Sequence, residues 1–156
     1  MFKVDAIRDA KHQNNHGLKK PMNADRIVSL ARATLNGSMP FPEIVANLIA
    51  EDVEYYHVDY AACTLTFYGT SGSTVSAPLL FEELPPISRE FDATALKAAI
   101  LDSQQHGQDF RAFCQRAMCA GVCGYFAFLR GQRVVYIGRQ GNQHTEWFPG
   151  ARPEGA

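Results

Sequence analysis

The stretch from Gln108 to Pro149 decides the fold, and it reads QDFRAFCQRAMCAGVCGYFAFLRGQRVVYIGRQGNQHTEWFP. Apolar side chains in its first part recur three and four positions apart, at Phe110, Phe113, Cys114 and Ala117. This spacing predicts a helix over 109–120 with one buried face, which Gly121 ends. Aromatic and β-branched residues then predict three strands separated by glycine-containing turns, over 122–129, 132–137 and 142–148.

The chain carries the same pattern 69 residues earlier, because Gly69 corresponds to Gly138. Core positions match core positions at this shift, for example Ile27 with Leu96, Phe41 with Phe110, Val53 with Val122, and Tyr56 with Tyr125. Two such units in one chain can bury a common core that neither has alone. We therefore predict an α+β fold with an internal duplication of two ααβββ units. Their strands are expected to be antiparallel, and the units to be related by a pseudo-two-fold axis.

This organisation predicts four parts of the chain: a polar N-terminal arm over 1–22, the first ααβββ unit with a connector over 23–91, the second ααβββ unit over 92–149, and a tail over 150–156. Helices of the first unit are expected over 23–35 and from Pro42 onward. The interface between the two units is a natural cleft, and we expect any binding site to lie there.

Composition limits the partners. The formal net charge is -1 and the pI is near 6.5, so no clustered basic face is expected and we predict no binding to nucleic acid. No apolar run has the length of a membrane span, and the polar start lacks the apolar core of a secretory signal. We predict a cytoplasmic protein with no membrane partner. A homodimer is one expected assembly, with the 1–22 arm as the segment that could mediate it.

The four cysteines do not form a paired zinc pattern, and they are too sparse for a disulfide scaffold. We expect Cys63, Cys114, Cys119 and Cys123 to be free thiols, mostly buried, and none to be a nucleophile. The many aromatic residues of the strands could stack on bases, but core and inter-unit packing is the favoured interpretation. A glycine-rich phosphate loop, a Ser–His–Asp order and a zinc-protease motif are all missing from the sequence, and no cofactor is predicted.

Several short motifs suggest a family: Gln104-Gln105, Phe113-Cys114, Ala120-Gly121-Val122, Tyr136-Ile137-Gly138, and Glu146-Trp147-Phe148-Pro149. On these motifs, residues 24–149 resemble the YbcV-like proteins, a domain-of-unknown-function family found in phage, prophage and bacterial sequences. The resemblance implies an α+β fold with internal duplication. It implies no activity.

Two pairs of polar residues are the candidate ligand-binding groups. His144 and Glu146 alternate on one predicted strand, so their side chains share a face. His57 and Asp59 do the same on another strand. A histidine held by a carboxylate can serve in acid–base chemistry or bind a metal. The alternative is a polar pair on a solvated sheet face.

The second unit has His144 and Glu146 where the first has Val75 and Ala77, so the shared fold does not require them. If the units pack symmetrically, both pairs could line one cleft and hold a metal with four ligands, although no metal is assigned. Three functions stay open. The leading one is a non-enzymatic domain that binds a small ligand or a protein between the repeats. The others are a metal-dependent or acid–base enzyme using the same groups, and a structural or host-interaction protein without a pocket.

Overall fold

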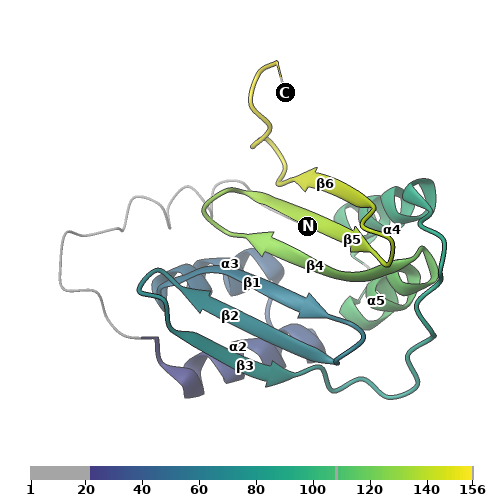
Figure 1. The fold of residues 1–156 in the computed structure, drawn as a ribbon. Coiled ribbons are helices and arrows are strands. Elements are labelled where there is room, and N and C mark those ends of the chain that lie inside the picture. Colours follow the sequence, from purple (N-terminus) through teal and green to yellow (C-terminus); the bar gives the residue numbers. More distant parts are fainter. Residues whose placement is uncertain (1–21, 108, 156) are drawn as a thin grey trace.

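The computed structural model describes residues 22–107 and 109–155, so the predicted arm lies, except for Met22, outside the described residues. Six strands form one antiparallel sheet in the order β3-β2-β1-β4-β5-β6 (Figure 1). The strands are β1 (Val53–Asp59), β2 (Thr64–Gly69), β3 (Thr74–Pro78), β4 (Val122–Phe128), β5 (Arg133–Gly138) and β6 (Gln143–Trp147).

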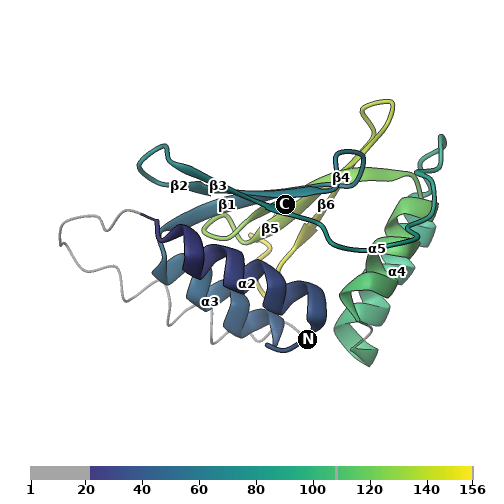
Figure 2. The same cartoon turned by 90° about the horizontal axis from the view of Figure 1, so that it is seen from below.

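The helices of the described chain are α2 (Ala24–Asn36), α3 (Phe41–Ala50), α4 (Ala93–His106) and α5 (Phe110–Cys119). Both helix pairs lie on the same side of the sheet, one pair under each half (Figure 2). The opposite side of the sheet carries none of the described helices, and we call it the uncovered face. This arrangement confirms the predicted α+β fold. None of these helices is both long and apolar enough to cross a bilayer.

The duplication extends to the ends of the elements. Helices α3 and α5 and all three strand pairs have bounds that differ by 69 residues. Asn23 and Asp92, one in each unit, cap their helices by accepting backbone N–H groups at 3.1 Å and 3.0 Å. Left-handed backbone recurs at equivalent places, in Asp52 (φ 67) and Gly121 (φ 90). Two ααβββ units are thereby confirmed.

Strands β1 and β4 join the two units. Their antiparallel ladder pairs His57 with Phe126, and these two residues are equivalent under the 69-residue shift. A ladder centred on two equivalent residues places the pseudo-two-fold axis between them. The two rings stack there, with centroids 4.3 Å apart. The units therefore share one continuous sheet, and their helix pairs face each other across its centre.

The core lies between the sheet and the helices. Alternate residues of each strand, such as Val58 and Ala127, point toward the helices and have no exposed surface. They pack against the apolar stripes of the helices, which include Ile27 and Leu96, also fully buried. Burying one such aliphatic side chain stabilises the fold by about 1.5–3 kcal/mol. Leu96→Ala is expected to cost about 2–5 kcal/mol, because the cavity adds to the lost transfer energy.

The aromatic residues divide between the two faces of the sheet. Tyr56, Tyr60, Phe67, Tyr125 and Tyr136 are buried on the helix side, as core packing predicted. Those on the uncovered face form a row of stacked or tilted rings, in the order Tyr68, Tyr55, Phe128, Phe126 and His57. Core packing is therefore the wrong interpretation for this second group, whereas the predicted inter-unit packing is present, for example between Tyr55 and Phe128. Strand alternation sends every second side chain of β1 and β4 away from the helices.

The four cysteines are free thiols, as predicted, but they are not mostly buried. Only Cys114 is fully buried, and Cys123 is half-buried. Cys63 lies in the turn after β1 and Cys119 in the last turn of α5, and both are exposed because these turns reach the surface.

Candidate functional site

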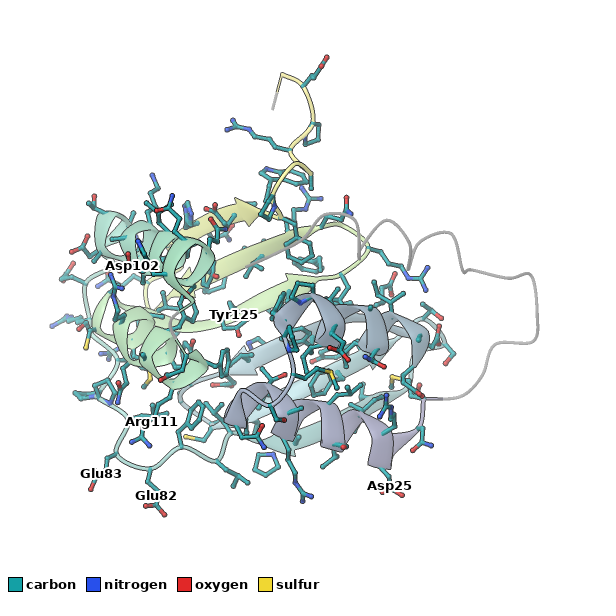
Figure 3. The ribbon with its side chains drawn as sticks, turned by 180° about the vertical axis from the view of Figure 1, so that it is seen from behind. Asp25, Glu82, Glu83, Asp102, Arg111 and Tyr125 are labelled. Carbon is teal, nitrogen blue, oxygen red and sulfur yellow. The ribbon has the colours of Figure 1, made fainter. Side chains whose placement is uncertain are left out.

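A cavity of about 390 Å³ lies between the two helix pairs, and we call it the inter-unit cleft. The sheet forms its floor with Tyr56, Tyr125 and Tyr136, and helices of both units form its walls. Seen from the helix side, Tyr125 lies between the two helix pairs (Figure 3). The interface between units is thus a cleft, as the sequence indicated.

The lining of the inter-unit cleft follows the duplication. Equivalent residues of the two units line it in five pairs: Thr34 with Ser103, Pro40 with Asp109, Phe41 with Phe110, Ile44 with Phe113, and Tyr56 with Tyr125. The walls are mainly apolar and aromatic, and the polar side chains are those of Thr34, Ser103, the tyrosines and Asp109. Such a lining, with few polar groups in a concave apolar surface, is typical of a site for a small molecule.

The floor of the cleft is a cluster of buried phenols. Tyr125 contacts Tyr136, Tyr60 and Tyr56, with ring centroids 5.3, 6.1 and 6.4 Å apart. Burial raises the pKa of Tyr56 well above its usual value, although a hydrogen bond with Tyr125 partly opposes this shift. Burial likewise raises the pKa of Tyr125 and of Tyr136. These phenols stay protonated at all physiological pH values and can donate hydrogen bonds.

Two buried groups lie beside this floor. The Tyr60 hydroxyl has no hydrogen-bond partner within the described part of the chain. Burial raises the pKa of the Cys114 thiol to about 12. A thiol with such a pKa is not an effective nucleophile at neutral pH, which agrees with the prediction that this cysteine belongs to the core.

His144 and Glu146 form a direct pair, with His144 Nε2 2.9 Å from Glu146 Oε2. They lie on the helix-facing side of the edge strand β6, where their side chains are 15% and 34% exposed. The pair is therefore half-covered and not on an open, solvated face. His144 lies opposite Tyr136, with ring centroids 6.3 Å apart. The pair thus lies directly behind one of the tyrosines that line the cleft.

His57 and Asp59 lie on the uncovered face, and each has a structural partner there. The His57 ring stacks on Phe126. Asp59 Oδ1 accepts the N–H of Ala62 at 2.9 Å, which closes the turn between β1 and β2. Neither residue lines the inter-unit cleft.

The two predicted pairs do not meet, because the sheet separates them. The hypothesis of a metal held by His57, Asp59, His144 and Glu146 together is therefore wrong. Within residues 22–107 and 109–155 no group of three or more histidine, cysteine, aspartate or glutamate side chains is placed to hold a metal ion. Ligand binding by either pair alone stays a prediction.

The residues that line the cleft were missed as site residues. The sequence did hold a signal for them: Phe41 and Phe110 match at the 69-residue shift, and both begin a helix. Matched aromatic residues at the start of two equivalent helices face each other when the units are related by a two-fold axis.

Two comparisons with known proteins complete this description. No curated protein matches the chain. Residues 32–146, which run from within α2 to within β6 and include most of both units, match a family described as "Protein of unknown function (DUF1398)". The chain belongs to this family of unknown function, as the resemblance to a domain-of-unknown-function family predicted.

Proposed function

We propose that this protein is a non-enzymatic binding domain that holds a small, neutral, mainly apolar molecule in the inter-unit cleft. The observation that carries the proposal is the cavity of about 390 Å³ with its matched aromatic walls and its floor of tyrosines. This volume is at the small end of typical ligand pockets. The tyrosine hydroxyls would donate to one hydrogen-bond acceptor of the ligand.

The electrostatics of the cleft favour a neutral ligand. Among the described residues no arginine or lysine lines it, and the one charged residue in its lining is Asp109. The Asp109 carboxylate accepts the N–H of Ala112 and caps helix α5. An anion would find no positive partner in the cleft, and its desolvation would be costly. A carbonyl or ether group can accept a hydrogen bond at much lower cost.

Calorimetric titration with 2-naphthamide, a flat neutral molecule with one amide group, tests the proposal. Binding is expected to weaken about three- to ten-fold in Tyr125→Phe, because one hydrogen bond is worth about 0.5–1.5 kcal/mol. Thr34→Phe places a ring in the cleft and is expected to abolish binding. Arg32→Phe, at an exposed position of the same helix, is the matched control. Equal binding by the Thr34 and Arg32 variants would contradict the proposal.

An acid–base enzyme is the second candidate, favoured by the 2.9 Å contact between His144 and Glu146 beside Tyr136. In such an enzyme, Glu146 would orient the imidazole, and His144 would move the proton. Release of 2-naphthol from 2-naphthyl acetate would measure this activity, and His144→Gln should reduce it to the background rate. A release rate that His144→Gln leaves unchanged would exclude this candidate.

The third alternative, a structural or host-interaction protein without a pocket, stays open. The cavity between the units counts against it, and the separation of the two histidine–acid pairs on opposite faces of the sheet counts in its favour. Four statements about identity, origin, location and assembly stay predictions. These are a YbcV-like identity, a phage or bacterial origin, a cytoplasmic location and a homodimer. A protein as the bound partner, in place of a small molecule, also stays a prediction.

A further inference from the structure

The uncovered face carries a second, separate depression of about 490 Å³, which we call the arginine groove. It lies where β1, β4, β5 and β6 run side by side, next to the turn between β4 and β5. Tyr55, Phe128 and Val135 form its apolar part. Arg130, Arg133 and Glu54 supply its charges.

The apolar part of the groove suits a flat ring. Tyr55 and Phe128 lie in neighbouring strands with ring centroids 5.6 Å apart, and Tyr55 also stacks on Tyr68 at 4.5 Å. The groove thus borders the middle of the aromatic row on the uncovered face, at Tyr55 and Phe128. A planar ring that enters it can continue this row of ring contacts, each worth about 0.5–1.5 kcal/mol beyond area burial.

Neither Arg130 nor Arg133 has an anionic partner in the part of the chain that the structure describes. The Nε atom of Arg130 is buried and has no hydrogen-bond partner among the described residues. The Arg133 guanidinium lies over the ring of Trp147, 4.6 Å from its centroid, and makes no ion pair within the described part of the chain. In contrast, Arg26 lies 4.0 Å from Glu51, and Arg116 pairs with Asp102. A buried donor without a partner is uncommon in native proteins and calls for one.

The second unit alone supplies the two positive charges of the groove. Arg130 and Arg133 correspond to Ala61 and Thr64 of the first unit, so the duplicated fold does not require them. The stacking on Trp147 holds the Arg133 guanidinium in place without using its hydrogen-bond donors. Glu54 is the one opposing charge in the groove, so the groove carries a formal net charge of about +1 at neutral pH.

We propose that the arginine groove binds a small planar aromatic molecule that carries an oxyanion, either a carboxylate or a phosphate. The ring would lie on Tyr55 and Phe128. The oxyanion would accept hydrogen bonds from Arg130 and Arg133, because the planar arginine fork matches both oxyanions. This site is independent of the inter-unit cleft, which lies on the opposite side of the sheet and has no arginine.

Titration with 2-naphthoate and 2-naphthyl phosphate tests this site and separates the two oxyanions. Trp147 is the only tryptophan of the chain and lies under Arg133, so the indole N–H signal of Trp147 in the NMR spectrum reports binding without interference from naphthyl fluorescence. We expect dissociation constants below about 1 mM, and the phosphate should bind more tightly if the site prefers the higher charge. Arg130→Gln and Arg133→Gln should each weaken binding about 10- to 100-fold, because each removes a charge-assisted hydrogen bond.

Two controls keep the outcome specific. Glu54→Gln removes the opposing charge and should strengthen binding a few-fold. Arg32→Gln, on an exposed site of α2, and Thr34→Phe, in the inter-unit cleft, should leave the binding of 2-naphthoate and 2-naphthyl phosphate unchanged. A wild-type protein that shows no Trp147 response would overturn the proposal, as would equal binding by the Arg130→Gln/Arg133→Gln double variant. Tighter, steeply salt-dependent binding of an oligothymidylate would overturn it in favour of a single-stranded nucleic acid.

Discussion

The two units have the same backbone and different polar chemistry. Where they agree, as at Tyr56 and Tyr125, the residues build the core and the floor of the cleft. Where they differ, each unit has polar residues that the other lacks, as in His144 against Val75 and His57 against Phe126. The comparison indicates that shared positions are kept by packing. The unshared polar positions are free to carry specific chemistry, because the fold forms without them.

The units also solve one packing problem in two ways. In the first unit Arg26 ties α2 to α3 by donating to Asn47 Oδ1 at 2.9 Å. In the second unit Arg116 ties α5 to α4 through an ion pair with Asp102. Asn47 and Arg116 are equivalent residues, so the arginine has moved from one helix of the pair to the other. In both units the residue at this position, Asn47 or Arg116, links the two helices of the pair. The link is a hydrogen bond to Asn47 in the first unit and an ion pair of Arg116 in the second.

The largest difference in unfolding free energy between the units is expected at an equivalent turn, which holds Gly121 in one unit and Asp52 in the other. A Cβ added at Gly121 would lie 2.2 Å from the carbonyl oxygen of Glu90, at a left-handed φ of 90. Backbone strain and this clash should make Gly121→Ala cost about 3 kcal/mol or more in unfolding free energy. Asp52→Asn at the equivalent turn should cost less than about 1 kcal/mol, because asparagine tolerates this conformation. Urea unfolding checks both, and equal losses would contradict the comparison.

The next effect tests the symmetry of the cleft floor. Tyr56→Ala and Tyr125→Ala each remove a buried ring and should each cost about 3–5 kcal/mol. Because the two residues are equivalent, their costs should agree within about 1 kcal/mol. Thermal unfolding followed by circular dichroism measures both, with the two phenylalanine variants as matched controls. A large difference in stability between the two alanine variants would show that the two tyrosines do not contribute equally to the floor of the cleft.

A smaller effect should appear at alkaline pH. The pKa of Cys114 is raised to about 12 from 9.0, so its contribution to stability is complete below pH 9 and is lost as the pH rises toward 12. Each pH unit in this range should cost up to about 1.4 kcal/mol. Cys114→Val, which copies Val45 of the first unit, should remove about 1 kcal/mol of the loss between pH 9 and 10, and the buried tyrosines, whose unfolded pKa is about 10, account for the rest of the loss there. Cys63→Val controls for the loss of a thiol. An unchanged slope in Cys114→Val would contradict the assignment.

The smallest effect concerns the exposed ion pair of the second unit. The hydrogen bond from Arg116 lowers the pKa of Asp102. The pair therefore adds stability above the ordinary pKa of the carboxyl group, and this contribution is lost as the pH falls through the lowered value. Asp102→Asn should lower the melting temperature slightly at pH 7 and not at pH 2. A large loss at both pH values would show that Asp102 acts through packing.

The fold could be predicted from the sequence because two independent copies of the pattern constrain each other. Turn glycines such as Gly72 and Gly141 fix the hairpins, and the matched apolar spacing fixes the helices. The pairing of β1 with β4 was not predicted, since nothing local in either strand specifies which edges of the two units meet. That pairing depends on how the two helix pairs fit beside each other.

The predicted shared face of His144 and Glu146 is confirmed, the predicted meeting of the two pairs is wrong, and ligand binding by either pair stays a prediction. Strand alternation shows that His144 and Glu146 share a face, and the structure places them 2.9 Å apart. Alternation does not show which face of the sheet that is. His57 corresponds to Phe126, an apolar residue that nevertheless lies on the uncovered face, so apolar character did not reveal the side. The arginine groove could not be predicted for the same reason, because its residues come from separate strands and meet only in the folded sheet.

One measurement tests the central claim, that the inter-unit cleft holds a small neutral ligand. Intermolecular nuclear Overhauser effects between 2-naphthamide and the protein's methyl groups would place the ligand directly. We predict contacts with Ile44 and Ile100, which line the cleft, and none with Val135 and Ile137 of the uncovered face. Contacts confined to the uncovered face, or no contacts at saturating ligand, would contradict the claim.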